Sequence, residues 1–308
     1  MTEVIKIILP VLIMLGIGIL CRKRQIITRE GINALKSVIV NIALPAVLIN
    51  AFATTRYTLM DAVIPLIMFA VCLAAWVLGK AAGKLFRLPS RFVPFLTTGF
   101  EAGMLGYALF GMLYGTERTA EFARLDLGQV LFVFTLYKIL LGMDSGKKVK
   151  TAGLLREMVL SPIILAIAAG VILGAAGIYE SLKPSGISGI FDVCVSFISA
   201  PTAAMILLAV GYDLVPGNIP WRETVKAVAL RLAIMLLLRV LLGLLFRALW
   251  PNADLTAAMN VMFILPPPFV LPVFADDADQ RTYVSAVLSL STLIAVVGFA
   301  VLAIAAGL

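Results

Sequence analysis

The residues with the clearest capacity for chemistry lie in one apolar stretch, residues 97–107, which reads Thr-Thr-Gly-Phe-Glu-Ala-Gly-Met-Leu-Gly-Tyr. A carboxylate such as that of Glu101 costs about 2.5–3.5 kcal/mol at the middle of a membrane and rarely faces lipid. It can carry a proton, pair with a cation or, with the hydroxyls of Thr97 and Thr98, offer oxygen ligands to Na⁺. We therefore predict that Glu101, Thr97 and Thr98 bind an ion, either a proton or Na⁺.

Three glycines accompany Glu101 in this stretch. Gly99, Gly103 and Gly106 follow one another at four- and three-residue spacing. Either they let neighbouring helices pack closely, or they mark a local unwinding whose freed backbone amides line a cavity. We favour the unwinding.

A second apolar stretch, residues 264–272, is interrupted by prolines and reads Ile-Leu-Pro-Pro-Pro-Phe-Val-Leu-Pro. Consecutive prolines remove backbone donors and crowd the preceding turn, so an ordinary helix cannot continue through Pro266 to Pro268. Half-helices that end there present amides with partial positive charge at their N-terminal ends and carbonyls at their C-terminal ends. Such a break favours a carboxylate ligand beside a cation.

Two basic residues are candidate partners for Glu101. Arg239, near the middle of its apolar stretch, is the preferred one, and Lys80 is the second. Arg231 is expected to extend to the nearest aqueous surface. Glu101 then either binds a proton or forms an ion pair with Arg239 that a ligand loosens; a fixed structural salt bridge is the alternative.

The composition places most of the chain in lipid. Of 308 residues, 62% are hydrophobic and 14% are charged, against roughly 25% charged residues in soluble domains. The apolar stretches are long enough to cross ~30 Å of hydrocarbon as helices, and they lack the alternation of a barrel. We therefore predict an all-α integral membrane protein.

The pattern of apolar stretches predicts ten spans. The first, from Val4, is followed rather than preceded by basic residues, which favours a span of the mature protein over a signal peptide. Most Lys and Arg residues lie in the odd-numbered connections, which predicts that these are cytoplasmic and that both termini lie outside an inner (plasma) membrane. The net charge of +8 is thus largely a matter of topology. The predicted spans are residues 4–21, 32–53, 60–85, 93–114, 127–142, 153–176, 189–210, 224–249, 256–274 and 283–306.

The two halves of the chain resemble each other. The segment Leu9-Pro10-Val11-Leu12, followed by Gly18, is similar to Ser161-Pro162-Ile163-Ile164, followed by Gly170. Five spans in each half make the second copy inverted, so we predict repeats at residues 1–146 and 147–308. Inverted repeats with broken helices in corresponding positions build secondary transporters. Spans four and nine are the predicted broken pair.

Several classes of protein are excluded by what the sequence lacks. It has no histidine and only three isolated cysteines, which excludes Cys/His metal sites and disulfide frameworks. No P-loop motif occurs, so primary pumping is not expected. We expect no enzymatic activity, no cofactor and no nucleic-acid partner. A channel or a transporter-like sensor without coupled turnover is the alternative to a carrier.

The chain resembles the auxin efflux carrier family, which is related to the bile acid sodium symporters. The resemblance rests on Val40-Asn41-Ile42-Ala43-Leu44-Pro45, Gly103-x-x-Gly106, Ser161-Pro162, Ala200-Pro201 and Pro266 through Ala275. It implies a scaffold of spans one, two, six and seven. It also implies a transport unit of spans three to five and eight to ten, with crossing helices four and nine.

The same resemblance implies elevator-like movement, homodimers and small carboxylate substrates. Two positions depart from the family: Glu101 stands where relatives have Asn, and Ala108 stands where they have Pro. We predict a secondary transporter of small organic anions, driven by H⁺ or Na⁺. Asn41 and Asn50 either face its cavity or form packing hydrogen bonds. The predicted substrate-binding residues are Asn41, Glu101, Gly103, Met104, Arg239, Pro266, Pro267 and Phe269.

Overall fold

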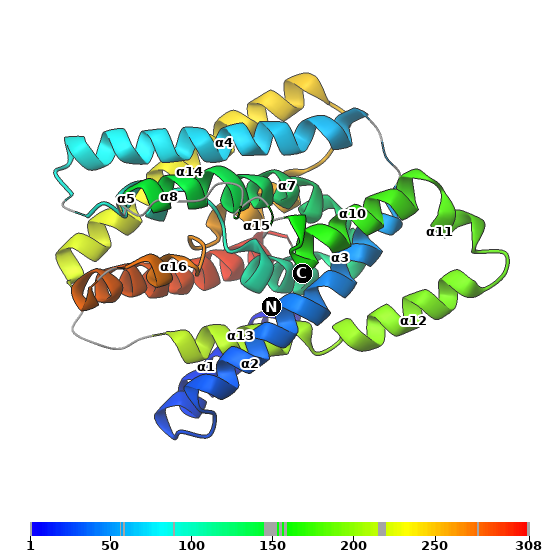
Figure 1. Cartoon of the computed structure of the whole chain (residues 1–308), viewed down its shortest axis with the longest axis horizontal. Coiled ribbons are helices and arrows are strands. Elements are labelled where there is room, and N and C mark those ends of the chain that lie inside the picture. Colours follow the sequence, from blue (N-terminus) through cyan, green and yellow to red (C-terminus); the bar gives the residue numbers. More distant parts are fainter. Residues whose placement is uncertain are drawn as a thin grey trace.

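A computed structural model shows a bundle of helices (Figure 1) and describes residues 2–55, 57, 59–88, 90–144, 153, 156, 159–214, 220–275 and 277–306. Helices account for 83% of the structure, and no strand occurs in those described ranges. The predicted all-α class is therefore confirmed.

Several helical segments in the described part of the first half are interrupted. A π-helical turn widens the second span just before Pro45, which is where the missing proline donor disturbs the regular hydrogen bonds. The elements in order are α1 (Thr2–Lys23), α2 (Arg29–Val38), η1 (Ile39–Ala43), α3 (Leu44–Ala53), α4 (Leu59–Leu85), α5 (Val93–Leu96), η2 (Ala102–Gly106), α6 (Tyr107–Tyr114), η3 (Thr116–Arg118), α7 (Thr119–Phe132), η4 (Val133–Tyr137) and α8 (Lys138–Asp144).

The second half repeats this kind of interruption. Its seventh predicted span divides at Ala200 and Pro201, and its ninth divides after Ile264. The elements are α10 (Pro162–Ala175), α11 (Ile178–Ser181), α12 (Ile187–Ser199), α13 (Thr202–Asp213), α14 (Trp221–Leu249), α15 (Thr256–Ile264), η5 (Leu271–Phe274) and α16 (Ala278–Ala305).

Six helical segments in the described part of the chain are long and apolar enough to cross a membrane, and two shorter apolar helices accompany them. Each overlaps one of the predicted spans. The repeat boundary at residues 146 and 147 lies outside the described residues, as do Lys147, Lys148 and Lys150 of the same predicted connection. The count of ten crossings and the division into two fives stay predictions. The long segments are Arg29–Ala53, Met60–Leu85, Thr119–Gly142, Ile187–Asp213, Trp221–Leu249 and Ala278–Ala305, and the shorter ones are Ala102–Tyr114 and Pro162–Ala175.

Glycines bring helices from the two halves into close contact. Helix α1 packs against α13, and α10 packs against α3. A Cβ atom on Gly18 would lie 2.2 Å from the carbonyl oxygen of Leu208, and one on Gly170 would lie 2.8 Å from that of Ile49. Gly18 and Gly170, which the sequence pairs across the two halves, thus both allow a helix of one half to approach a helix of the other.

Large apolar side chains cover much of the outer surface. Phe197 on α12 is 85% exposed, and Leu236 and Leu244 on α14 are 67% and 61% exposed. Apolar surface of this extent marks contact with a membrane rather than with water. The packed interior instead holds aromatic rings, such as Phe95, which meets Tyr137 edge to face at 5.3 Å.

Candidate functional site

The fourth predicted span is broken at the predicted place. Residues 97–101 separate α5 from η2 and have no helical structure. Gly99 has φ +69°, in the left-handed region, and a Cβ atom there would lie 2.9 Å from Cγ of Pro268. Both the backbone conformation and the close approach require glycine. The break forms although Ala108 stands in the place of the family's proline.

The ninth predicted span is broken at its prolines, and this break meets the first one. Helix α15 ends at Ile264, after which Leu265 is extended. The backbone N–H of Glu101 donates to the carbonyl oxygen of Pro266 at 2.9 Å. The two interrupted segments therefore touch at Glu101, and we call this point the crossing.

The Glu101 carboxylate is bound by backbone amides of both segments. Its Oε1 accepts from the N–H of Met104 at 3.2 Å, and its Oε2 accepts from the N–H of Phe269 at 2.5 Å. Glu101 thereby caps the helix that begins at Ala102. We call the two amides of Met104 and Phe269 the carboxylate cradle. Charge-assisted hydrogen bonds of this kind are about twice as strong as neutral ones.

Arg231 binds the carbonyl ends of the same segments. Its Nη1 donates to the carbonyl oxygen of Leu96 at 3.0 Å, and its Nη2 donates to those of Gly99 and Leu265 at 2.8 Å each. The side chain is only 2% exposed. The expectation that it extends to the aqueous surface is wrong, because the last carbonyls of two helix ends need donors and a guanidinium fork supplies several at once.

Arg239 and Lys80 do not contact Glu101. Both Nε and Nη2 of Arg239 donate to Oδ1 of Asn260, at 2.9 and 2.7 Å. The predicted ion pair between Glu101 and Arg239 is wrong, because Arg239 lies eight residues, or ~12 Å, beyond Arg231 along α14 and meets α15 instead. Lys80 is exposed, with Nζ 4.8 Å from the centre of the Trp76 ring.

The two predicted ion-binding threonines are buried beside the crossing. The hydroxyl of Thr98 donates to the carbonyl oxygen of Cys72 at 2.6 Å, and that of Thr97 donates to the carbonyl oxygens of Val93 and Pro94 at 3.0 and 3.1 Å. Their hydrogens are therefore committed to the backbone, and their role toward a cation stays a prediction.

The remaining predicted residues lie in three places: at the crossing, against neighbouring helices and on the outer surface. Pro266 and Pro267 are buried at the crossing. Gly103 faces α3, since a Cβ atom there would lie 3.3 Å from Cδ2 of Leu44, and Met104 packs on the small cluster around Cys21. Asn41 is exposed and its amide donates to the carbonyl and hydroxyl oxygens of Ser37.

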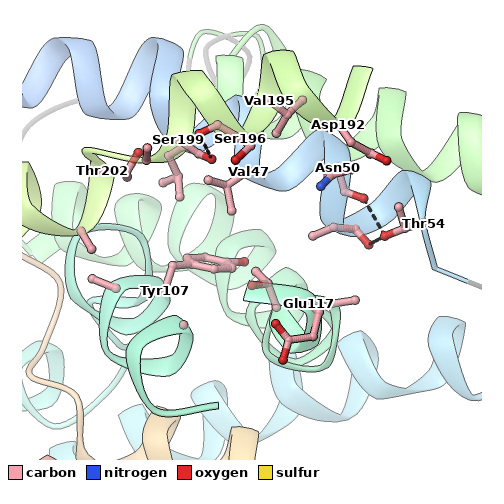
Figure 2. Close-up of a pocket in the computed structure, with 18 of the residues that line it drawn as sticks. Val47, Asn50, Thr54, Tyr107, Glu117, Asp192, Val195, Ser196, Ser199 and Thr202 are labelled. Carbon is pink, nitrogen blue, oxygen red and sulfur yellow. Dashed lines mark hydrogen bonds between the residues drawn. The ribbon is translucent and has the colours of Figure 1, made fainter. Parts of the chain in front are cut away.

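A cavity of about 730 Å³ opens between two sets of helices (Figure 2). Helices α3, α12 and α13 form one wall, and α6 and α7 with η3 form the other. Asn50 lies on the first wall and Tyr107 on the second. Asn50 therefore faces this space, whereas Asn41 is not among the residues that line it. Among the described residues, the lining contains the acidic residues Glu117 and Asp192 and no Lys or Arg.

A buried hydrogen-bonded chain connects the cavity to the crossing. The Tyr107 hydroxyl donates to Oδ2 of Asp126 at 2.9 Å, and Nε2 of Gln129 donates to Oδ1 of Asp126 at 3.1 Å. The N–H of Phe100, next to Glu101, donates to Oε1 of Gln129 at 3.4 Å.

A family model described as membrane transport protein matches residues 3–303 of the chain. The chain belongs to this family. The resemblance to auxin efflux carriers is thereby confirmed over nearly the whole sequence. No curated protein matches the chain.

As a member of the membrane transport protein family, the chain is a membrane transporter, and its apolar helices agree with a location in a membrane. In the described part of the chain, polar groups gather at the crossing and line the cavity.

Sequence reasoning missed two polar groups of this site. Asp126 precedes the predicted fifth span by one residue, so the predicted boundaries put it outside the membrane interior. The spacing of Asp126 and Gln129 nevertheless indicates a polar pair, because residues three apart share one face of a helix. Arg231 lies near the cytoplasmic end of its predicted span, which predicts extension to the aqueous surface, and nothing in the sequence reveals that two broken helix ends lie beside it.

Proposed function

We propose that this transporter is a secondary carrier of small organic anions and that it binds their carboxylate groups at the crossing. The observation that carries this proposal is the carboxylate cradle, in which two backbone amides from different halves of the chain bind the carboxylate of Glu101. Backbone amides at a helix start favour a negative group of this shape. A substrate carboxylate would form the same two hydrogen bonds.

The presence of the Glu101 carboxylate in the cradle has a consequence for the transport mechanism. Two carboxylates cannot accept from the same two amides, so a substrate must displace Glu101 from the cradle. Once displaced, Glu101 needs a proton or a cation, because an uncompensated charge inside a membrane is costly. This exchange couples substrate binding to H⁺ or, alternatively, to Na⁺.

Helix packing supports an elevator-like movement. Helices α1 to α3 pack with α10, α12 and α13, and we propose that they form the scaffold. Helices α4 to α8 and α14 to α16 pack with one another and form the proposed transport unit, which carries the crossing (Figure 1). The cavity lies between the two groups. The exposed apolar face of α12, which includes Phe197, is available for the scaffold contact of a homodimer.

The proposed orientation predicts the side of the membrane to which the cavity opens. Thr54, Glu117 and Tyr179 line the cavity near connections that the distribution of Lys and Arg places outside. With both termini outside an inner membrane, the cavity opens outward.

Uptake into proteoliposomes tests the proposal. The purified protein is reconstituted, a panel of mono- and dicarboxylates is offered, and pH and Na⁺ gradients are imposed separately. We expect uptake of at least one carboxylate that one of the gradients drives. A matched variant, Glu30→Gln, changes an exposed carboxylate in the first turn of α2, outside the crossing and the cavity lining, and should retain uptake. Specific binding without uptake would favour a sensor, and neither binding nor uptake of any carboxylate would contradict the proposal.

A further inference from the structure

Asp126 is a buried carboxylate whose partners are neutral. It is 2% exposed and accepts hydrogen bonds from the Tyr107 hydroxyl and the Gln129 amide. No Lys or Arg of the described part of the chain pairs with it. An ionised carboxylate that is buried without a cation is strongly disfavoured, and such a group tends to take up a proton.

The Tyr107 hydroxyl connects this carboxylate to the cavity. Tyr107 belongs to the cavity lining, and Figure 2 shows its ring on the wall opposite Val47. A tyrosine hydroxyl both donates and accepts. It can donate to an ionised Asp126, or accept from a protonated Asp126 while its own hydrogen turns to the cavity. Both protonation states of Asp126 therefore keep a hydrogen bond to Tyr107.

We propose that Asp126 is a proton-binding site of the transporter and that it exchanges its proton with the cavity through Tyr107. In the uptake step, a hydronium ion in the cavity gives a proton to the Tyr107 oxygen and becomes water. The original hydroxyl hydrogen of Tyr107 passes to Oδ2 of Asp126. Tyr107 is neutral before and after the step, and Asp126 changes from carboxylate to carboxylic acid.

The proton on Asp126 is linked to the crossing through Gln129. The Gln129 side chain donates to Asp126 and accepts from the backbone of Phe100, which precedes Glu101. Neutralising Asp126 weakens the first of these hydrogen bonds, because a bond to an ionised group is the stronger kind. A change of charge at Asp126 thus changes the strength of the hydrogen bonds through which Gln129 holds the backbone beside the carboxylate cradle.

The groups that face Asp126 come from several elements. Among the described residues, Tyr107 of α6, Cys72 of α4 and Glu101 at the crossing are the titratable side chains that interact with it electrostatically. Glu101 carries the same sign of charge as Asp126, so ionising both at once is unfavourable. Neither α3 nor α15, which also pack on α7, contains a charged residue.

Infrared difference spectroscopy of the full-length protein in lipid tests the proposal, with the proton itself as the probe. Spectra are recorded over a pH series from weakly acidic to weakly alkaline, without any organic substrate. We expect a C=O stretching band of a protonated carboxyl that grows toward acidic pH. The band should be absent from Asp126→Asn and should be retained in Glu101→Gln.

Two results would overturn the proposal. One is a spectrum of Asp126→Asn that retains the whole band, and the other is an Asp126 band that does not change with pH. If Asp126→Asn does not fold, Tyr107→Phe takes its place, because it keeps the ring contact with Phe122 at 5.0 Å. Loss of the hydroxyl should shift the frequency of the band, and an unshifted band would also overturn the proposal. These spectra require no transport, so a failure of the proposed function is seen separately, in the uptake assay.

Discussion

The carboxylate of Glu101 accepts a hydrogen bond from the backbone N–H of Phe269, a residue 168 positions further along the chain. This bond joins two interrupted helices from opposite halves of the sequence. It places an acidic side chain of the protein on amides that suit a carboxylate ligand.

Glu101→Gln should weaken the crossing and alter the response to pH. A glutamine side chain has one carbonyl oxygen, so one of the two amides of the carboxylate cradle loses its acceptor, which costs about 1–3 kcal/mol. We expect a lower midpoint of thermal unfolding than in wild type. We also expect uptake of the substrate found by screening to lose its dependence on a pH gradient. Unchanged uptake and an unchanged pH profile would exclude Glu101 as a coupling group.

Substitution of Arg231 should destabilise the fold more than substitution of Arg239. Arg231→Gln leaves carbonyls of Leu96, Gly99 and Leu265 short of donors, and each hydrogen bond to a charged group contributes about 1.5–3 kcal/mol. Arg231→Lys keeps the charge but not the planar fork, so only part of the stability should return. The measurement is thermal unfolding in detergent, with Arg239→Gln as the control. Equal loss in the two glutamine variants would contradict the account of Arg231.

Two glycines of α1 provide a matched pair for the packing of the scaffold. Gly18→Ala places a methyl group 2.2 Å from the carbonyl oxygen of Leu208, whereas Gly16→Ala meets no atom within 4 Å. We expect Gly18→Ala to lose about 1–3 kcal/mol through overpacking. Gly16→Ala should be neutral or slightly more stable, because alanine is the better helix former. The measurement is the midpoint of thermal unfolding of the two purified variants. A lower midpoint for Gly16→Ala than for Gly18→Ala would be inconsistent with the contact between α1 and α13.

A large side chain in the cavity should block movement without unfolding the protein. Ala203 lines the cavity, whereas its neighbour Ala204 is exposed on the other face of α13. We expect Ala203→Trp to reduce uptake at least about tenfold, a barrier increase of about 1.4 kcal/mol. Ala204→Trp, the control, should transport normally. Normal uptake by Ala203→Trp would contradict the proposal that the cavity lies between a fixed and a moving unit.

The positions of the helix breaks could be predicted from local residues. Pro266 to Pro268 cannot continue a helix, and Gly99 adopts a backbone conformation that other residues rarely adopt. Both are properties of a few consecutive residues. The sequence therefore predicts both breaks correctly, and the first one forms at residues 97–101 although Ala108 replaces the expected proline.

The partners of the interior charges could not be predicted in the same way. Arg231 and Arg239 lie on the same helix, and either could bind an acidic residue. Arg231 binds carbonyls because the ends of two helices from different halves converge beside it, and that convergence depends on the packing of the whole bundle. Asp126 was missed because helix α7 begins earlier than its apolar stretch does.

The most direct test of the central claim is to empty the carboxylate cradle and refill it with a free carboxylate. Glu101→Ala removes the internal occupant, and the unfolding midpoint is measured with increasing sodium acetate and with sodium chloride at equal ionic strength. Acetate at a hundred times its Kd would stabilise the variant by about 2.7 kcal/mol. The account predicts a rise in the midpoint that is specific to acetate in Glu101→Ala and absent from wild type and from Glu117→Ala. Equal responses of all three proteins to acetate would contradict it.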